Sequence, residues 1–547
     1  MSRSTRSADV ARALRIARFC DANRLTTAHG LERVRHEETR HAVRRSNRRE
    51  WLATVARVAA TGAAASVATP FEPLLAGAPQ RPAVDVGIVG AGLAGLACAD
   101  ALAGRGIRPA IYDASTRTGG RCWSLHGFFP GQVAERGGEF IDNLHKTILQ
   151  YANRFGLAVE DVTKQPGEVF YFFDGQSVPE SAVVEEFRDF VAVMRLDLVR
   201  LSQEVTAFSH TENDVALDRT SLLAYLEGEN RARTAAGPLA KAAIVQAYVA
   251  EYGLEPDRQS CLNFLLFIHA DRRSKFTPFG VFSDERYHLI DGNDRVVEGL
   301  TQGLPRPVEG GMRLLAVRRT SSGRVELGFD TPAGIVSRTH DAVVLAIPFS
   351  TLRDVTLDSN LAIPQRQREA IEQLGYGMNA KMMVGFTSRP WAGQGSNGSS
   401  YSDLPNHQAT WETNPARATP ARAVLTDYSG GDRGRSLDPL AVQLEASRFL
   451  ADLDRVFPGA ASAARRNRGE VVAHLEHWPS NPFTRGSYTC YLPGQFTTIA
   501  ALEGLPVGNV FFAGEHANSF YDFQGFMEGA ALSGIAAAAA ILKPAKR

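Results

Sequence analysis

The sequence predicts an α/β protein in which a parallel sheet binds a dinucleotide, and three adjacent observations support this fold class. Residues 86–89 (VGIV) form a short apolar run typical of a buried parallel strand. A GxGxxG motif follows at residues 90–95, at the start of an expected helix. Residues 108–115 (RPAIYDAS) then supply a second strand that ends at an acidic residue. The order strand, glycine turn, helix, strand and acid is far more specific than the glycine motif alone.

Each residue of this motif has a distinct physical role. Gly90 permits the tight turn, Gly92 lets the backbone approach a pyrophosphate, and Gly95 lets the helix pack closely on the strand. The N–H groups and the dipole at the helix start then face the phosphates. Asp113, at the end of the second strand, is placed to accept hydrogen bonds from ribose hydroxyls.

A second glycine-rich motif distinguishes FAD from NAD. Gly120 and Arg121 lie in TRTGGRCWS, and Gly138 and Glu139 lie in AERGGEFID. At this point the chain resembles the flavin-dependent amine oxidase family, which includes monoamine oxidases, polyamine oxidases and L-amino-acid oxidases. In that family the Gly-Gly-Arg motif wraps the FAD pyrophosphate, whereas NAD enzymes have no use for it. The resemblance therefore implies FAD, with these four residues at the cofactor.

The resemblance recurs from about Val84 to Leu542 and implies further cofactor contacts. The backbone of Val317 would meet the adenine, and Gly514 and Glu515 would follow the last strand of the cofactor domain. A closing helix rich in small residues would begin near Met527 and point its dipole at the pyrimidine edge of the flavin. The implied fold is a Rossmann-like, glutathione-reductase-like FAD domain with an interleaved α+β substrate-binding domain.

The cofactor domain is expected to be discontinuous, with segments 82–150, 286–355 and 500–545. The two insertions between them, 151–285 and 356–499, are expected to form the substrate-binding domain over the flavin. The first insertion contains apolar residues at helical spacing, and the second mixes strands with polar stretches.

The resemblance also implies the residues of the reaction. Lys381 lies in an otherwise apolar strand, where family members keep a lysine that holds a water against flavin N5. A positive charge there favours reoxidation by oxygen. Trp478 would pack near the ring, and Tyr488 and Phe526 would be two aromatic walls on the flavin face.

Three departures from the family pattern bear on the substrate and on the linkage of the cofactor. Ser487 replaces the cysteine that monoamine oxidases bond to the flavin, so we expect non-covalent FAD. Phe526 replaces the second tyrosine of the monoamine oxidases. Phe140 stands where L-amino-acid oxidases place the arginine that grips the substrate carboxylate.

We therefore expect an FAD-dependent oxidase of primary or secondary amines. Hydride transfer to flavin N5 would give an imine, and O2 would be reduced to hydrogen peroxide. L-amino-acid oxidation is the main alternative. A desaturase or protoporphyrinogen-oxidase-like enzyme and a non-catalytic FAD-binding protein are weaker ones. Which amine is oxidised, and whether the protein is a homodimer, stay open.

Composition bounds the remaining properties. A chain of 547 residues is too long to fold around a single compact core, so we expect at least two domains. Its formal net charge of +1 gives no sign of nucleic-acid binding. The five scattered cysteines argue against a disulfide framework and a structural zinc site. Residues 1–80 resemble a twin-arginine export leader, with Arg48–Arg49, a short alanine-rich run and small residues at 66–68. The run is too short to span a membrane stably, so we expect a periplasmic or secreted protein, and otherwise a cytoplasmic one.

Overall fold

The computed structural model describes most of the chain between residues 84 and 543 and part of its N-terminal region. The described residues are 13–14, 16–18, 20–21, 24–33, 84–229, 235–269, 285–518 and 523–543.

A four-stranded parallel sheet forms the centre of one half of the molecule. Its order is β2 (Ala110–Tyr112), β1 (Val86–Val89), β12 (Ala342–Leu345) and β21 (Val510–Phe512). These short apolar strands are almost entirely buried, because both faces of the sheet are covered by other elements. The sheet thus joins strands that lie more than 400 residues apart in the chain.

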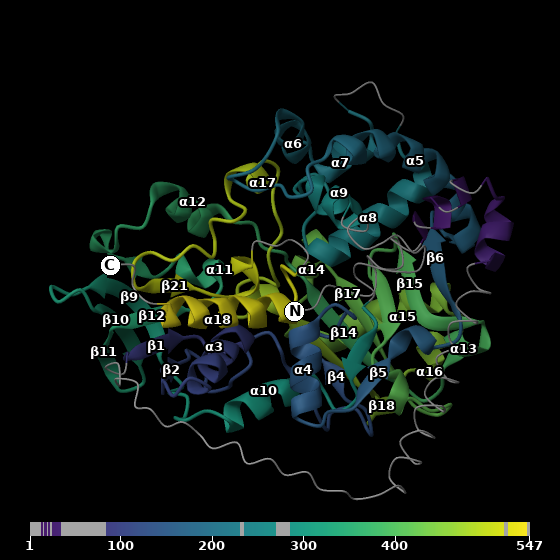
Figure 1. The fold of residues 1–547 in the computed structure, drawn as a ribbon. Helices are drawn as coiled ribbons and strands as arrows, with labels where there is room; N and C mark the ends of the chain where they lie inside the picture. Colours follow the sequence, from purple (N-terminus) through teal and green to yellow (C-terminus); the bar gives the residue numbers. More distant parts are fainter. Residues whose placement is uncertain are drawn as a thin grey trace, which may run out of the picture.

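Two helices rich in small residues pack beside this sheet. They are α3 (Leu93–Ala103) and α18 (Met527–Leu542), and Figure 1 shows α18 alongside α3. A side chain at Gly534 would place its Cβ 2.0 Å from the carbonyl oxygen of Ala94. The helices can approach this closely only because glycine stands at that position.

A mixed, mostly antiparallel sheet adjoins the parallel one. Its order is β11 (Gly334–His340), β10 (Val325–Thr331), β9 (Arg313–Arg319) and β13 (Thr356–Leu357), the last strand pairing parallel to β9.

A seven-stranded sheet organises the other half of the molecule. It combines two strands of the first predicted insertion with five strands of the second, in the order β20 (Ala473–His477), β14 (Ala380–Phe386), β17 (Ala423–Ser429), β16 (Ala409–Glu412), β15 (Ser396–Ser402), β6 (Glu168–Phe173) and β7 (Gln176–Val178).

The side chains of β14 alternate between two environments, as strand geometry requires. Met382 and Val384 join the core formed with α15 (Val442–Val456), whereas Met383 packs with Phe129 on the opposite face. Lys381 shares the face of Met383, which is the face turned toward the glycine-rich segment 134–139.

Helix α8 (Pro238–Tyr252) crosses this sheet and packs against α5 (Glu180–Arg200). It ends at Gly253, whose φ of +72° forms a left-handed cap. The freed carbonyls at this end are used by the loop before β14: Met378 N–H donates to Gly253 O (2.7 Å) and Asn379 Nδ2 donates to Ala250 O (2.7 Å).

The remaining elements connect or cover these sheets. They are β3 (Ser124–Leu125), β4 (Ala134–Glu135), α4 (Lys146–Arg154), β5 (Val159–Asp161), α6 (Glu212–Asp218), α7 (Leu222–Leu226), α9 (Leu262–His269), β8 (Tyr287–Leu289), α10 (Asp294–Gln302), α11 (Phe349–Leu352), α12 (Gln365–Gln373), α13 (Pro390–Gly393), α14 (Gly431–Ser436), α16 (Ala460–Ala463), β18 (Arg466–Asn467), β19 (Glu470–Val471) and α17 (Gln495–Thr498).

The described N-terminal residues pack against α5, where Figure 1 draws them in purple beside α5 and β6. Ala13, Ile16 and Cys20 are buried. Arg188 Nη1 donates to Thr27 Oγ1 (3.1 Å), and an Arg195–Asp21 ion pair (2.9 Å) adds a second link. Described residues between 13 and 33, within the segment predicted to be an export leader, therefore contact α5.

The motif residues of the predicted leader, Arg48–Arg49 and the small residues at 66–68, lie outside the described residues, so the export interpretation stays a prediction. Within the part of the chain that is described, no helix combines the length and apolarity needed to cross a bilayer. The five cysteines are all buried and free of disulfide bonds.

Candidate functional site

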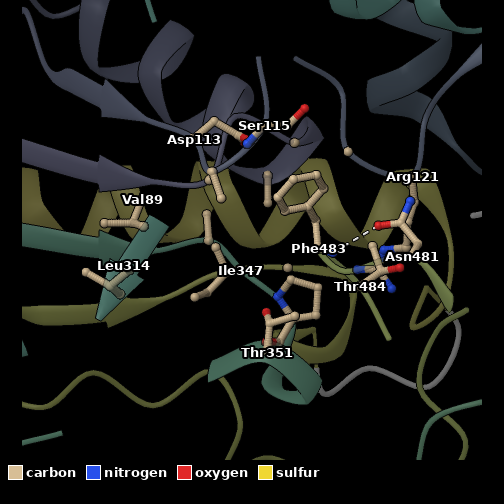
Figure 2. A pocket seen from close by; sticks show the side chains of 18 of the residues that line it. Val89, Asp113, Ser115, Arg121, Leu314, Ile347, Thr351, Asn481, Phe483 and Thr484 are labelled. Carbon is tan, nitrogen blue, oxygen red and sulfur yellow. Dashed lines mark hydrogen bonds between the residues drawn. The ribbon is translucent and has the colours of Figure 1, made fainter. Parts of the chain in front are cut away.

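A cavity of about 270 Å³ lies at the carboxyl ends of the parallel strands. Val89 and Gly90 line it at the end of β1, Asp113 after β2, Ile347 after β12 and Gly514 after β21. Figure 2 shows Val89, Asp113 and Ile347 around this space. Open α/β sheets bind ligands at this edge, so the cavity is the expected nucleotide site.

Two helices begin at the cavity. Gly92 is the N-cap of α3, and a Cβ built on it meets nothing within 4 Å. Phe526 is the N-cap of α18, and Met527 and Ala530 line the same cavity. Neither cap carries a side-chain hydrogen bond, so N–H groups of both first turns are available to an anionic ligand. A diphosphate suits this arrangement.

Asp113 fixes the glycine turn and faces the cavity. Its Oδ2 accepts Ala91 N–H (2.6 Å) and its Oδ1 accepts Ser115 N–H (2.7 Å). Burial raises the pKa of this carboxyl. Each carboxylate oxygen has a further lone pair, so Asp113 can still accept a hydrogen bond from a ribose hydroxyl.

The Gly-Gly-Arg motif continues the cavity wall. Gly120 has a φ of +56°, and its carbonyl accepts Arg117 Nη2 (2.6 Å). The Arg117 guanidinium lies 4.0 Å from the ring centroid of Trp123, and burial lowers its pKa. Sequence reasoning missed Arg117 as a lining residue, although an arginine two positions before the paired glycines was a usable signal.

Arg121 and Glu515 form a buried ion pair that joins three distant segments. Arg121 Nη1 donates to Glu515 Oε1 (2.8 Å) and to Ser487 O (2.7 Å). Glu515 Oε2 accepts Gly525 N–H (3.0 Å) and Thr489 N–H (3.5 Å). Burial pushes the pKa of Glu515 up, but Arg121 and the other partners outweigh it, and the pKa is lowered. Glu515 therefore holds the backbone next to both predicted aromatic walls.

Lys381 is buried, and its ammonium group donates three hydrogen bonds to the segment 135–139. Its Nζ donates to Glu135 O (3.0 Å), Gly137 O (2.8 Å) and Glu139 Oε2 (2.6 Å). The ring centroid of Trp411 lies 5.4 Å from the same atom. The lysine is thus held by the glycine-rich segment 135–139.

That segment also contacts the cavity wall. Trp478, which lines the cavity, donates its indole N–H to Arg136 O (2.9 Å), and Gly138 N–H donates to Arg121 O (2.9 Å). A Cβ at Gly137 would lie 1.8 Å from Arg121 O. The cavity and Lys381 therefore lie on either side of one strip of backbone.

The two predicted aromatic walls are both buried. Tyr488 donates its hydroxyl to Glu251 O at the end of α8 and accepts a hydrogen bond from Tyr428 (3.1 Å). The ring of Phe526 lies 4.7 Å from that of His145. That both rings stand on the flavin face stays a prediction.

Two predicted cofactor residues lie behind the cavity wall. Gly95 is inside α3, where a Cβ would be 1.9 Å from Gly90 O. Val317 is buried in β9, and its carbonyl accepts Asp358 N–H (3.0 Å). The residues of this strand that line the cavity are Arg313, Leu314 and Leu315, so the adenine contact of Val317 stays a prediction.

Comparison with known proteins agrees with this geometry. The profile of the family described as flavin containing amine oxidoreductase matches residues 93–542. The chain belongs to the flavin-containing amine oxidoreductase family. The predicted family, the α/β FAD-binding fold and the assignment as an FAD-dependent oxidoreductase of amine donors are confirmed.

Among curated relatives of this amine oxidoreductase, an L-amino-acid oxidase of Bungarus fasciatus is 23% identical over 82% of this chain and 85% of the relative. A putative L-amino-acid oxidase of Bacillus subtilis is 24% identical over 82% of this chain and 92% of the relative.

Among solved structures, cyclohexylamine oxidase from Brevibacterium oxydans superposes with a TM-score of 0.69 at 22% identity, over 84% of this chain and 99% of that chain. Putrescine oxidase bound to putrescine superposes with a TM-score of 0.69 at 20% identity, over the same two shares. These structures share the fold of this amine oxidoreductase.

Proposed function

We propose that this amine oxidoreductase oxidises a primary or secondary amine and passes the electrons to O2, forming hydrogen peroxide. The observation that carries the proposal is the position of Lys381, which is buried on the far side of the strip of backbone that walls the nucleotide cavity. Bound FAD would supply the hydride acceptor for the α-carbon of the amine. The product imine would then hydrolyse to an aldehyde or ketone.

The chain's own residues would hold FAD and orient the amine. Gly92 and the start of α3 would hold the pyrophosphate, and the N-terminus of α18 would stabilise negative charge on the reduced ring. Tyr488 and Phe526 would present aromatic faces to a partly positive amine nitrogen. The burial of both rings supports a dry site, in which such contacts are strong.

Phe140 supports an amine rather than an α-amino acid as substrate. It is buried, and its ring centroid lies 5.5 Å from that of Trp411 in an edge-to-face contact. At this position a substrate carboxylate would meet an apolar ring, where L-amino-acid oxidases offer a guanidinium group. The names of the two curated relatives favour the alternative, so both substrate classes enter the test.

The test is anaerobic mixing of the purified yellow protein with a panel of amines and the matching L-amino acids. Bleaching of the flavin absorbance by amines, with peroxide release after oxygen is admitted, is the expected result. Bleaching only by L-amino acids would assign the alternative. An oxidised spectrum that no member of the panel changes would count against both activities.

Non-covalent FAD is part of the proposal. The residue before Tyr488 is Ser487, whose hydroxyl donates to Asn379 Oδ1 (2.5 Å). Acid precipitation should therefore release all of the flavin into the supernatant. Flavin retained in the pellet would show a covalent bond.

We also propose that the cofactor domain comprises 82–150, 286–355 and 500–545, with the insertions forming the substrate-binding domain. The parallel sheet, which takes strands from all three segments, supports this division. Export through a twin-arginine pathway is proposed from Arg48–Arg49, and replacement of both residues by lysine should retain the protein in the cytoplasm.

A further inference from the structure

The hydrogen bonds of Lys381 account for every donor of its ammonium group. An ammonium carries three N–H bonds and no acceptor. Glu135 O, Gly137 O and Glu139 Oε2 take one each, at 3.0, 2.8 and 2.6 Å. No donor remains for the water that the family lysine is expected to hold. The ammonium is therefore fixed by protein groups, and one of its three partners carries a charge.

Glu139 is itself fixed at both carboxylate oxygens. Its Oε2 accepts Lys381 and its Oε1 accepts the indole N–H of Trp411 (2.6 Å). The side chains of Lys381 and Glu139 are only 4% and 2% exposed. Salt in the solvent screens such a buried pair weakly, so each charge is felt strongly by the other and by its surroundings.

The other carboxylates near Lys381 do not form an ion pair with it. Glu135 offers Lys381 only its backbone carbonyl, and burial raises the pKa of its side chain to about 8. Glu515 is paired with Arg121, and Glu476, opposite Lys381 on β20, is paired with Arg136. Among the described residues, Glu139 is the carboxylate in ion-pair contact with Lys381.

We propose that Glu139 is a positioning residue that cancels the charge of Lys381 and so restrains the reaction of the reduced enzyme with O2. The inference rests on the proposed function and deepens it by naming the residue that sets the rate of the oxidative half-reaction. In that step two electrons pass from reduced FAD to O2. One proton comes from the reduced ring and one from solvent, giving hydrogen peroxide and oxidised FAD.

The physical reason is the sign of the developing charge. Negative charge appears on O2 when it takes up an electron, and a nearby net positive charge stabilises it. A Lys–Glu pair has a net charge of zero, whereas the lysine alone contributes +1. Removing only the carboxylate should therefore accelerate reoxidation, and removing only the ammonium should slow it.

The test uses four forms of the FAD-loaded protein that differ in the summed charge of residues 139 and 381. They are E139Q (+1), the wild type (0), the double variant K381M/E139Q (0) and K381M (−1). Glutamine keeps an acceptor oxygen for Lys381, so E139Q removes the charge and retains the shape. Each protein is reduced with dithionite and mixed with oxygenated buffer, and recovery of the yellow absorbance gives the reoxidation rate.

We expect E139Q to reoxidise about tenfold faster than the wild type and K381M about tenfold slower. The double variant should match the wild type. A rate for E139Q equal to or below that of the wild type overturns the proposal. So does a double variant that reoxidises like K381M, because the ammonium would then act as an indispensable donor. If E139Q does not retain FAD, the comparison of the double variant with K381M still tests the proposal.

Sulfite provides a readout that involves neither oxygen nor turnover. Sulfite adds to oxidised flavin at N5 and forms an anionic adduct, so its dissociation constant reports the nearby charge. E139Q should bind sulfite about tenfold more tightly than the wild type, and K381M about tenfold more weakly. Equal dissociation constants in all four proteins would overturn the proposal.

Glu412 offers a matched control. It is a buried carboxylate on β16 of the same sheet, ion-paired with Arg389 rather than with Lys381. E412Q should leave both the reoxidation rate and the sulfite constant at wild-type values. Neither assay contains an amine. A protein that no amine reduces would refute the proposed function, yet the reoxidation rates and sulfite constants of the four forms could still be compared.

Discussion

The nucleotide cavity and the surroundings of Lys381 lie side by side but are built from different parts of the chain. Where the cavity meets the strand ends and the start of α3, it is lined by glycines, namely Gly90, Gly92 and Gly514. Lys381 is surrounded by large and charged side chains, among them Glu139 and Trp411. The nucleotide cavity depends on keeping this space empty, and the surroundings of Lys381 depend on pairing between side chains.

This difference indicates how each region should fail when altered. A glycine packed directly against backbone leaves no room for an added side chain, because backbone cannot move aside cheaply, whereas a glycine that faces the cavity does have that room. A region made of paired side chains tolerates a change of shape but not the loss of a partner, because an unpaired buried charge is costly. The predictions below test this contrast, beginning with the largest expected effect.

Gly95→Ala should damage the nucleotide region most. The new Cβ would lie 1.9 Å from the carbonyl oxygen of Gly90, so α3 must move away from β1. We expect a loss of about 3 kcal/mol or more in the free energy of unfolding, with loss of bound FAD. Denaturant unfolding measures the first quantity and flavin absorbance the second.

Gly92→Ala is the matched control for that prediction. Its Cβ meets nothing within 4 Å, so the fold should keep its stability while FAD binds more weakly. The contrast between the two regions would be wrong if Gly92→Ala destabilised the protein as much as Gly95→Ala.

Glu515→Gln tests the boundary between the two regions. The variant leaves Arg121 without its buried counter-ion, and we expect a loss of about 3 kcal/mol in unfolding free energy at pH 7. Because the pKa of Glu515 is lowered from 4.5, the stabilisation is present above about pH 4.5 and is lost as the pH falls through the lowered value. The wild type and the variant should therefore converge in acid, and a constant difference would contradict this assignment.

His516 should make the stability of this boundary depend on pH in a less acidic range than Glu515 does. Burial lowers its pKa from 6.5 to about 4, so the unfolded chain binds one more proton between these values. The free energy of unfolding should fall by about 3 kcal/mol as the pH drops across this window. His516→Phe, which keeps a ring against Phe349, should flatten that slope in chemical denaturation curves. A slope that persists in the variant would assign the effect to another group.

Tyr428→Phe should have the smallest effect, because it removes one hydroxyl and keeps the ring. The hydrogen bond to Tyr488 (3.1 Å) is worth about 1 kcal/mol of unfolding free energy. Tyr488 still donates to Glu251 O, so the variant should retain FAD and its spectrum. A loss of cofactor in Tyr428→Phe would mean that the Lys381 region supports the cavity directly.

The residues of the cavity were largely predictable from the sequence. Gly90, Gly92, Asp113 and Arg121 were expected at the cofactor, and all four line the cavity. Gly90, Gly92 and Asp113 were found because local backbone demands leave a mark within a few neighbouring residues, and Arg121 was found through the family resemblance. Val317 was predicted from the family resemblance, and its adenine contact stays a prediction, since residues 313–315 are the part of that strand that lines the cavity.

The partners of Lys381 were not predictable in the same way. Glu139 was expected to contact the cofactor, and nothing in AERGGEFID indicated that it would pair with a lysine 242 residues later. Trp411 carried no signal at all. The docking of the described residues between 13 and 33 on α5 was missed for the same reason, since each contact joins segments far apart in the chain.

The sequence by itself determined the dinucleotide-binding fold, because glycine turns and strand ends are local requirements that only certain residues satisfy, and its resemblance to a known family determined the FAD cofactor. The tertiary structure alone decided that Lys381 is neutralised by Glu139 and that Arg121 and Glu515 tie the two aromatic segments together. Charge pairing depends on distance in space, and that distance is fixed only when remote strands pack into one core.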